Sequence, residues 1–294
     1  GLLLKSTIYL YDGSPFFPNP EILWNYVDSE KINFMGVSAK YIDALSKENI
    51  NIIDKYDLSD LEIIGSTGSP LVHESFDYIY KNVKKDVSVA SLSGGTDIVG
   101  CFIGGNPMSV VRRGEIQGPI LGMDVHVYNE NGHSIKNEKG ELVCTQSFPT
   151  MPLFFWNDEK NEKYHEAYFN KYPNVWCHGD YIVKTEKDGF IIFGRSDATL
   201  NPGGVRIGTA EIYRQVEQIK EVLEGLVVGQ IWQGDTRIVL FVRLDPKSDL
   251  TEDLINKIKT KIKIGASPRH VPSKIIVVND IPRTKSGKIA ELAV

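Results

Sequence analysis

Two short apolar segments, each followed directly by a loop of small residues, constrain the fold of this chain more than any other feature. Residues 61–64 (Leu-Glu-Ile-Ile) precede the loop 65–70 (Gly-Ser-Thr-Gly-Ser-Pro), and residues 87–90 (Val-Ser-Val-Ala) precede the loop 91–97 (Ser-Leu-Ser-Gly-Gly-Thr-Asp). Such loops bring backbone N–H groups to a ligand at the carboxyl ends of parallel strands. One such loop is more typical of a plain tight turn. Two in succession predict an α/β sheet in which adjacent strands place the two loops side by side, with a nucleotide or phosphate site at that edge.

Composition excludes several classes of protein. With 294 residues we expect more than one domain, and a net charge of -5 provides no basic face for nucleic acid. A run of lysines between 257 and 263 is more typical of a solvated helix face. The cysteines Cys101, Cys144 and Cys177 are odd in number and far apart, which favours a reducing, cytoplasmic setting over a disulfide framework or a cysteine zinc site. No apolar run approaches membrane-spanning length. The sequence leaves the oligomeric state open.

Three zones differ in pattern along the chain. Residues 1–125 have the α/β pattern. Residues 126–197 have short strands around Asn131-Gly132, a strong hairpin signal, and predict a small β subdomain that we expect to be an antiparallel barrel. Residues 198–294 alternate amphipathic helices with strands and predict a compact α+β domain.

The stretch 193–206 has the features of a junction between domains. Arg195 and Arg206 keep their charge near neutral pH, and Asp197 and a Gly-Gly pair lie between them. An ordinary loop with surface arginines is the simpler interpretation of this stretch alone. Together with the two small-residue loops, it predicts a place where two domains reach one anionic ligand.

Phosphate chemistry needs cations or N–H donors around the oxygens and an acidic residue for Mg²⁺. Thr96 could donate its hydroxyl to a phosphate, and Asp97 could hold the metal. Asp180 could accept from ribose hydroxyls, although a turn Asp bonded to its own backbone is as common. Arg195 and Arg206 could contact ribose or phosphate.

Lys288 lies in a Ser-Gly-Lys sequence close to the last residue, Val294. Alone, such a lysine is typical of a mobile surface. As a functional group it would bring a positive charge to a reaction in which negative charge collects. His178 and His270 are isolated in the sequence, and we interpret them as structural or peripheral.

Taken together, the motifs have the order found in one family. They are residues 65–70, Gly-Gly-Thr-Asp at 94–97, His-Gly-Asp at 178–180, Gly-Arg-Ser-Asp at 194–197 with its continuation to Glu211, and residues 282–288. Over nearly the whole chain this order resembles the adenylate-forming acyl-CoA synthetases, a superfamily that also holds luciferases and peptide-synthetase adenylation domains. The resemblance implies an AMP-forming acid–thiol ligase with ATP, CoA and a carboxylic acid as substrates and Mg²⁺ as cofactor.

The resemblance also implies roles for individual residues. Gly68, Ser69 and Pro70 would line the adenine, Thr96 would contact the α-phosphate, Asp97 would bind Mg²⁺, Asp180 and Arg195 would hold the ribose, and Arg206 would lie near the phosphate. Asp197 would be the hinge about which a mobile domain 198–294 turns between the two half-reactions. Lys288 would orient the carboxylate against the α-phosphate, and Gly204 would lie on the path of CoA.

Residues 93–98, 200–202, 285–288 and 291–294 resemble the family members that activate acetoacetate. Thr67, Gly94 and Gly95 would then line the acyl pocket. Acetate-activating members carry Trp where Gly94 stands, so glycine would leave room for a longer acid, and Gly94→Trp would shift preference towards acetate. Another acid, such as acetate, propionate or butyrate, is the alternative within the family.

The family's Ser/Thr/Gly-rich loop for the β- and γ-phosphates does not occur in this sequence. We therefore expect the chain to be the C-terminal part of a synthetase, with only part of the large N-terminal domain, and inactive by itself. A catalytically incomplete nucleotide-binding fragment is the alternative outside enzymes.

Overall fold

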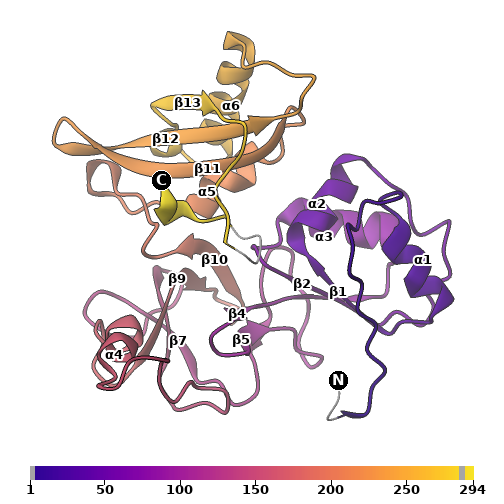
Figure 1. Cartoon of the computed structure of the whole chain (residues 1–294), viewed down its shortest axis with the longest axis horizontal. Helices are drawn as coiled ribbons and strands as arrows, with labels where there is room; N and C mark the ends of the chain where they lie inside the picture. Colours follow the sequence, from indigo (N-terminus) through magenta and orange to yellow (C-terminus); the bar gives the residue numbers. More distant parts are fainter. Residues whose placement is uncertain (1–3, 285–288) are drawn as a thin grey trace.

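The computed structural model describes residues 4–284 and 289–294, whose elements form three groups in chain order. Figure 1 shows the first group in indigo and purple, the second in magenta, and the third in orange and yellow above them. All three approach one another near the middle of the molecule. Within the described ranges, no helix combines the length and the apolar character needed to span a bilayer.

The first group is a three-stranded parallel sheet with helices packed on it. Ile64 pairs with Val89, and Ser66 pairs with Ser91, so β2 and β3 end side by side. The expected neighbouring position of the two small-residue loops is thereby confirmed. Buried Ile64, Val89 and Trp24 belong to the core of this group. Its elements are α1 (Ile22–Ser29), β1 (Phe34–Ser38), α2 (Ala39–Lys47), β2 (Ile63–Thr67), α3 (His73–Tyr78), η2 (Ile79–Val83) and β3 (Ser88–Ser91).

The second group consists of two open antiparallel sheets, of order β4-β5-β6 and β10-β9-β8-β7. The expected barrel is therefore wrong for the described residues. A barrel requires its first and last strands to pair, but β7 and β10 are the two edges of the larger sheet. The elements are β4 (Ser93–Gly95), β5 (Gly100–Gly104), β6 (Gly118–Pro119), β7 (Val125–Tyr128), β8 (Lys139–Cys144), α4 (Glu162–Tyr168), β9 (Trp176–Lys184) and β10 (Phe190–Arg195).

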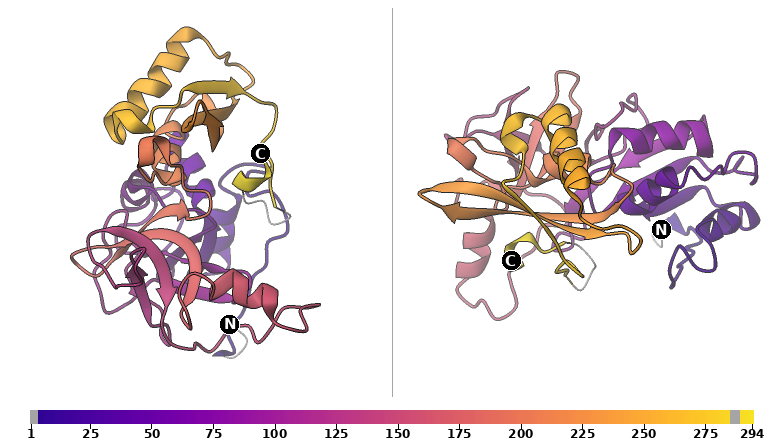
Figure 2. Two further views of the ribbon diagram at one scale, coloured as in Figure 1. Left: turned by 90° about the vertical axis from the view of Figure 1, so that its left-hand side faces the viewer. Right: turned by 90° about the horizontal axis from the view of Figure 1, so that it is seen from above.

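The third group packs α5 and α6 on a sheet of order β11-β12-β13. Apolar side chains at helical spacing, among them Ile212, Val216, Ile258 and Ile262, are buried against the sheet. Figure 2 shows α6 on the outer side of this group. Its elements are η3 (Pro202–Gly204), α5 (Thr209–Val216), β11 (Val222–Trp232), β12 (Asp235–Leu244), α6 (Glu252–Gly265), η4 (Pro268–His270), β13 (Lys274–Val277) and η5 (Glu291–Ala293).

Polar contacts hold the third group against the other two. Lys40 Nζ of α2 lies 2.6 Å from Glu224 Oε1 of β11, and Glu224 is only 7% exposed. Lys139 Nζ of β8 lies 2.6 Å from Glu211 Oε1 of α5. Separation of the two surfaces would break such a partly buried ion pair and return both charged groups to water. These contacts therefore stabilise the arrangement in which the groups enclose a common space.

Glu217, directly after α5, lies in this contact region. Its burial, together with the nearby carboxylates of Asp43 and Glu224, raises its pKa to about 7, although Lys40 and Lys47 oppose the shift. Burial disfavours the charged form of a carboxyl group because the carboxylate loses its hydration. Glu217 is thus a protonatable group in the contact between the third group and α2.

Ile262 and Ile264 of α6 offer a test of the core, because one is fully buried and the other is 80% exposed. We expect Ile262→Ala to lower the free energy of unfolding by about 2–4 kcal/mol, through lost burial and the cavity left behind. Ile264→Ala should change it by less than about 0.5 kcal/mol. Urea denaturation of both variants measures the difference, and equal effects would contradict the packing described here.

Glu217→Gln should make the protein more stable above neutral pH. Because the folded-state pKa is raised to about 7 from a reference near 4.5, the folded state binds the proton more tightly. Stability is therefore lost as pH rises through the interval between the two values, and glutamine avoids this loss. The gain should be nearly absent at pH 4 and on the order of 3 kcal/mol at pH 8.

Glu221→Gln is the control for that measurement, because a hydrogen bond from Lys257 lowers the pKa of Glu221. A folded-state pKa below the reference value stabilises the protein above that value, so this variant should gain nothing at pH 8. Urea titrations at several pH values distinguish the two variants. An equal gain in stability at pH 4 and pH 8 for Glu217→Gln would contradict the raised pKa of Glu217.

Candidate active site

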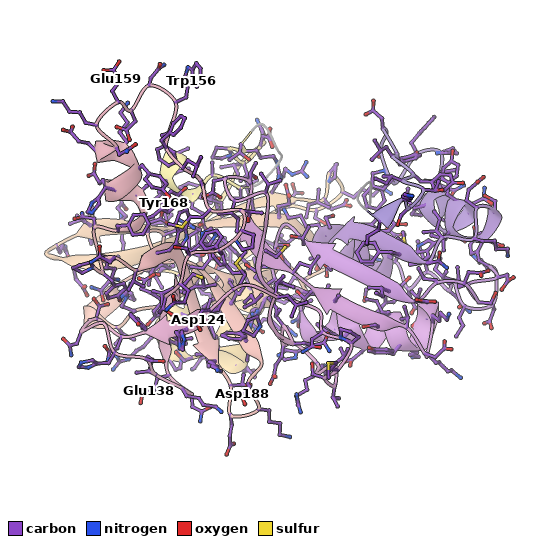
Figure 3. All side chains as sticks on the ribbon, turned by 90° about the horizontal axis from the view of Figure 1, so that it is seen from below. Asp124, Glu138, Trp156, Glu159, Tyr168 and Asp188 are labelled. Carbon is purple, nitrogen blue, oxygen red and sulfur yellow. The ribbon has the colours of Figure 1, made fainter. Side chains whose placement is uncertain are left out.

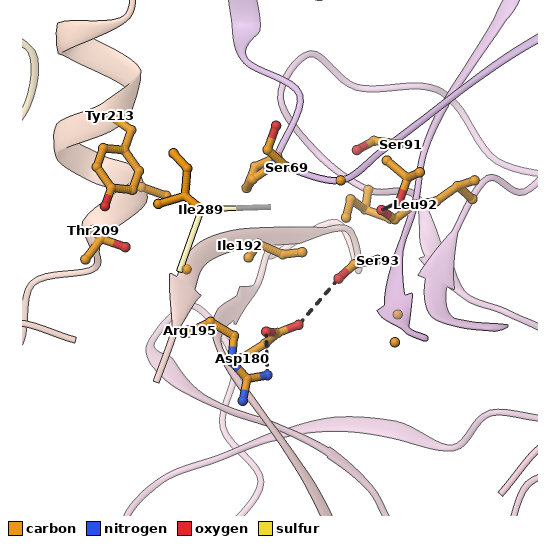
Figure 4. A pocket seen from close by; sticks show the side chains of 18 of the residues that line it. Ser69, Ser91, Leu92, Ser93, Asp180, Ile192, Arg195, Thr209, Tyr213 and Ile289 are labelled. Carbon is orange, nitrogen blue, oxygen red and sulfur yellow. Dashed lines mark hydrogen bonds and ion pairs between the residues drawn. The ribbon is translucent and has the colours of Figure 1, made fainter. Parts of the chain in front are cut away.

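A cavity of about 870 Å³ lies where the three groups meet. The loops after β2 and β3 form one side, β9 and β10 form another, and α5 forms a third (Figure 4). Because β2 and β3 are parallel and adjacent, their loops enter the cavity together. Of the residues predicted to bind the nucleotide, the structure brings six to its wall: Gly68, Ser69, Pro70, Thr96, Asp180 and Arg195.

A charged cluster forms the floor of the cavity. Arg195 Nη1 donates to the His178 carbonyl oxygen at 2.9 Å and lies 3.4 Å from Asp180 Oδ1. Ser93 Oγ donates to the other Asp180 oxygen at 3.4 Å, and Figure 4 shows both interactions as dashed lines. Burial opposes the charge of Arg195, but the carboxylates of Asp180 and Asp197 outweigh it and raise its pKa. The cluster therefore presents a fixed carboxylate and a permanent cation to the cavity.

His178 lies beside this cluster and is 8% exposed. Its burial lowers its pKa, so the imidazole is neutral near pH 7. Its ring packs edge-on against Phe102, with centroids 4.7 Å apart. His178 also lines the cavity, so its interpretation as structural or peripheral stays a prediction.

Asp97 lies on the wall of the cavity, and its Oδ2 accepts a hydrogen bond from the Tyr168 hydroxyl. Among the described residues there is no group of three or more His, Cys, Asp or Glu side chains suited to a metal. Mg²⁺ commonly takes one or two carboxylates and completes its shell with water and substrate phosphates. One exposed carboxylate beside a nucleotide-sized cavity fits such a site.

The residues predicted to form the acyl pocket, Thr67, Gly94 and Gly95, also line the cavity. Gly94 is packed directly against β5, because a Cβ there would overlap the Gly100 carbonyl oxygen and lie 2.5 Å from Cys101 Cα. The expectation that glycine leaves room for a longer acid stays a prediction, but this backbone has no free space for a side chain at position 94. Gly94→Trp would have to move β4 away from β5 before it altered the pocket.

Other predicted site residues lie away from the cavity wall or outside the described part. Arg206 forms an ion pair with Glu130 and lies over the Tyr181 ring, 4.8 Å from its centroid. Gly204 belongs to η3 and does not line the cavity. Asp197 pairs with Arg195 at 3.4 Å just beyond the wall. Lys288 falls outside the described residues, so its predicted role stays a prediction.

Sequence reasoning missed two tyrosines on the cavity wall, Tyr168 of α4 and Tyr213 of α5. The Tyr213 hydroxyl donates to Glu291 Oε1 at 2.7 Å and accepts from the Val227 N–H at 3.0 Å. An aromatic residue on an amphipathic helix is usually interpreted as core, and nothing in the local sequence marks these two as different. Only the position of each helix beside the loops reveals the contact.

Several known proteins are similar to this chain in sequence and in fold. The chain is 58% identical over its full length to an acetoacetyl-coenzyme A synthetase from Rhizobium meliloti (strain 1021), of which it spans 45%. A solved acetoacetyl-CoA synthetase from Streptomyces lividans matches 96% of the chain at a TM-score of 0.89 and 40% identity, over 43% of that structure. An anthranilate CoA ligase, AuaEII, solved with anthranoyl-AMP, shares the fold at a TM-score of 0.77 and 21% identity, covering 95% of this chain and 52% of that one.

No family model matches the chain. The assignment therefore depends on the relatives, of which the chain spans less than half in the acetoacetyl-CoA synthetases. Their similarity extends through all three groups of elements and through the loops that meet at the cavity. Over its full length the chain is therefore homologous to part of the acetoacetyl-CoA synthetases, and solved acyl-CoA ligases share its fold.

Proposed function

We propose that this chain provides the adenosine side of the active site and the C-terminal unit of an acetoacetate–CoA ligase. In that reaction ATP activates acetoacetate to an acyl adenylate with release of pyrophosphate, and CoA then takes the acyl group with release of AMP. The observation that carries the proposal is the 58% identity, over the whole chain, to an acetoacetyl-coenzyme A synthetase. The convergence of six predicted nucleotide-binding residues on one cavity supports it.

The polar groups of the cavity suit an adenylate. Asp180, with its orientation set by Ser93 and Arg195, can accept from both hydroxyls of a ribose. The loop with Gly68, Ser69 and Pro70 would face the adenine, and Thr96 would donate to the α-phosphate. Fixed groups of this kind lower the barrier because they are already oriented when charge develops.

The first half-reaction brings a carboxylate towards the negatively charged α-phosphate. Mg²⁺, held beside Asp97 together with the phosphates, would supply positive charge that offsets this repulsion. In our proposal Lys288 contributes a second positive charge during adenylation. Binding both reactants in one cavity also removes the entropy cost of their encounter.

The third group would move between the half-reactions, with Asp197 as the hinge of domain 198–294. Arg206 and Gly204 lie away from the cavity in the present arrangement, which suits roles that begin only after a rotation. The Lys40–Glu224 ion pair would then have to break. Thr67, Gly94 and Gly95 would contact the acyl group.

Two alternatives remain for the reaction. A ligase for acetate, propionate or butyrate would use the same adenosine groups, because only the acyl pocket distinguishes the acids. A nucleotide-binding protein without catalysis would bind AMP but exchange no pyrophosphate.

Asp180→Asn should weaken the binding of AMP by about 10- to 100-fold, because a charge-assisted hydrogen bond to the ribose would be replaced by a weaker one. Asp188→Asn is the control, since Asp188 lies in an exposed turn and pairs with Lys136 at 3.0 Å. Isothermal titration calorimetry measures both affinities, and circular dichroism checks that both variants fold. Equal affinities for wild type and Asp180→Asn would remove Asp180 from the nucleotide site.

ATP–pyrophosphate exchange separates the proposed reaction from its alternatives. We expect exchange with acetoacetate and little with acetate or butyrate from the complete gene product that contains this chain. Exchange with acetate or butyrate instead would identify a different acid as the substrate and would still support the proposed type of reaction. AMP binding without exchange for any of the acids would support the non-catalytic alternative.

A further inference from the structure

The carboxylate of Asp97 is exposed towards the cavity, yet its orientation is constrained from two sides. On one side the Tyr168 hydroxyl donates a short hydrogen bond, 2.5 Å long, to Oδ2. On the other side the side chain folds back over Gly95, where a Cβ would overlap Oδ1. An exposed aspartate without such contacts would sample several rotamers. Oδ2 thus accepts a hydrogen bond from Tyr168. Oδ1 occupies the space that a side chain at position 95 would fill.

Tyr168 is itself rigidly held, although it is far from Asp97 in the sequence. Its ring stacks on Trp176 with centroids 3.6 Å apart and an interplanar angle of 13°. Trp176 is 1% exposed and packs edge-on against Phe148 and Phe169. Figure 3 shows Tyr168 towards the centre of the molecule, whereas Trp156 and Glu159 lie at the outer tip of the same region. The aromatic cluster thus fixes the hydroxyl at the cavity wall.

We propose that Tyr168 is a positioning residue that orients the Asp97 carboxylate towards a divalent cation bound with the phosphates of the nucleotide. The inference depends on the proposed function, because it takes Asp97 as the carboxylate ligand of that cation. With Oδ2 held by Tyr168, Oδ1 is the oxygen left for the metal. Hydrogen-bonding partners of metal-binding carboxylates raise affinity by preparing the ligand geometry, and their loss typically weakens metal binding 10- to 100-fold.

A purely structural role for Tyr168 predicts a different outcome from a positioning role. If the stack on Trp176 is all that matters, phenylalanine should replace tyrosine without consequence, because the ring is retained. If the hydroxyl positions Asp97, its removal should weaken binding of the cation. Binding of the nucleotide in the absence of metal should not change. The comparison therefore needs one variant that removes only a hydroxyl.

The test uses Tyr168→Phe with Tyr164→Phe as the matched control. The Tyr164 hydroxyl belongs to the same aromatic cluster but donates to the Pro152 carbonyl oxygen at 2.6 Å, away from Asp97. Mn²⁺ is titrated in the presence of ATP and followed by electron paramagnetic resonance, with the complete gene product that contains this chain. We expect about 10-fold weaker Mn²⁺ binding for Tyr168→Phe, and no change for Tyr164→Phe. The affinity for ATP in EDTA should be the same for all three proteins.

A double-mutant cycle with Asp97→Asn identifies the route of the effect. If Tyr168 acts through Asp97, Tyr168→Phe should have no further effect on Mn²⁺ binding in the Asp97→Asn background. Additive effects, or unchanged Mn²⁺ binding in Tyr168→Phe, would overturn the positioning role while leaving the ligase proposal intact. A wild-type protein that binds no ATP would instead overturn the proposed function and this inference together.

Discussion

The Asp180–Arg195 pair connects the parts of the molecule on which the cavity depends. The pair joins β9 to β10, and Asp180 accepts a hydrogen bond from the Ser93 hydroxyl of β4. It extends through Arg195 to Asp197 at the proposed hinge. A partly buried carboxylate is stable only when a cation and hydrogen bonds compensate for its lost hydration. Arg195 and Ser93 therefore stabilise the Asp180 carboxylate and fix its orientation. A ligand with hydroxyl groups can donate hydrogen bonds to this carboxylate without further rearrangement.

Electrostatics also controls how the third group is attached. Glu224 is almost buried and faces Lys40 of the first group, while Arg243 and Arg283 of its own group also pair with it. Glu224 thus keeps cationic partners whether or not Lys40 remains in contact. Glu217 is less well compensated, which is why burial raises its pKa. A contact that includes the Lys40–Glu224 ion pair and a buried carboxyl group with a raised pKa suits the movement that we propose for the third group.

Much of the first group and of the cavity could be predicted from local patterns. The strand–loop pairs at 61–70 and 87–97 predicted adjacent parallel strands, and β2 pairs with β3 in that way. The roles of the residues on those loops remain predictions. The expected barrel was wrong, because short alternating strands show only that a sheet is antiparallel. Whether its edges close depends on register and twist, which involve residues distant in sequence.

The sequence by itself determined where the polar loops follow buried strands and which charged residues stand beside them, because these features follow from local hydrophobic pattern and turn chemistry. Tertiary structure alone decided that Tyr168 meets Asp97, that Lys40 meets Glu224, and that Gly94 is pressed against β5. Those contacts join residues from separate elements, and the packing of whole groups sets their distances. Periodicity within one segment carries no information about what another segment places against it.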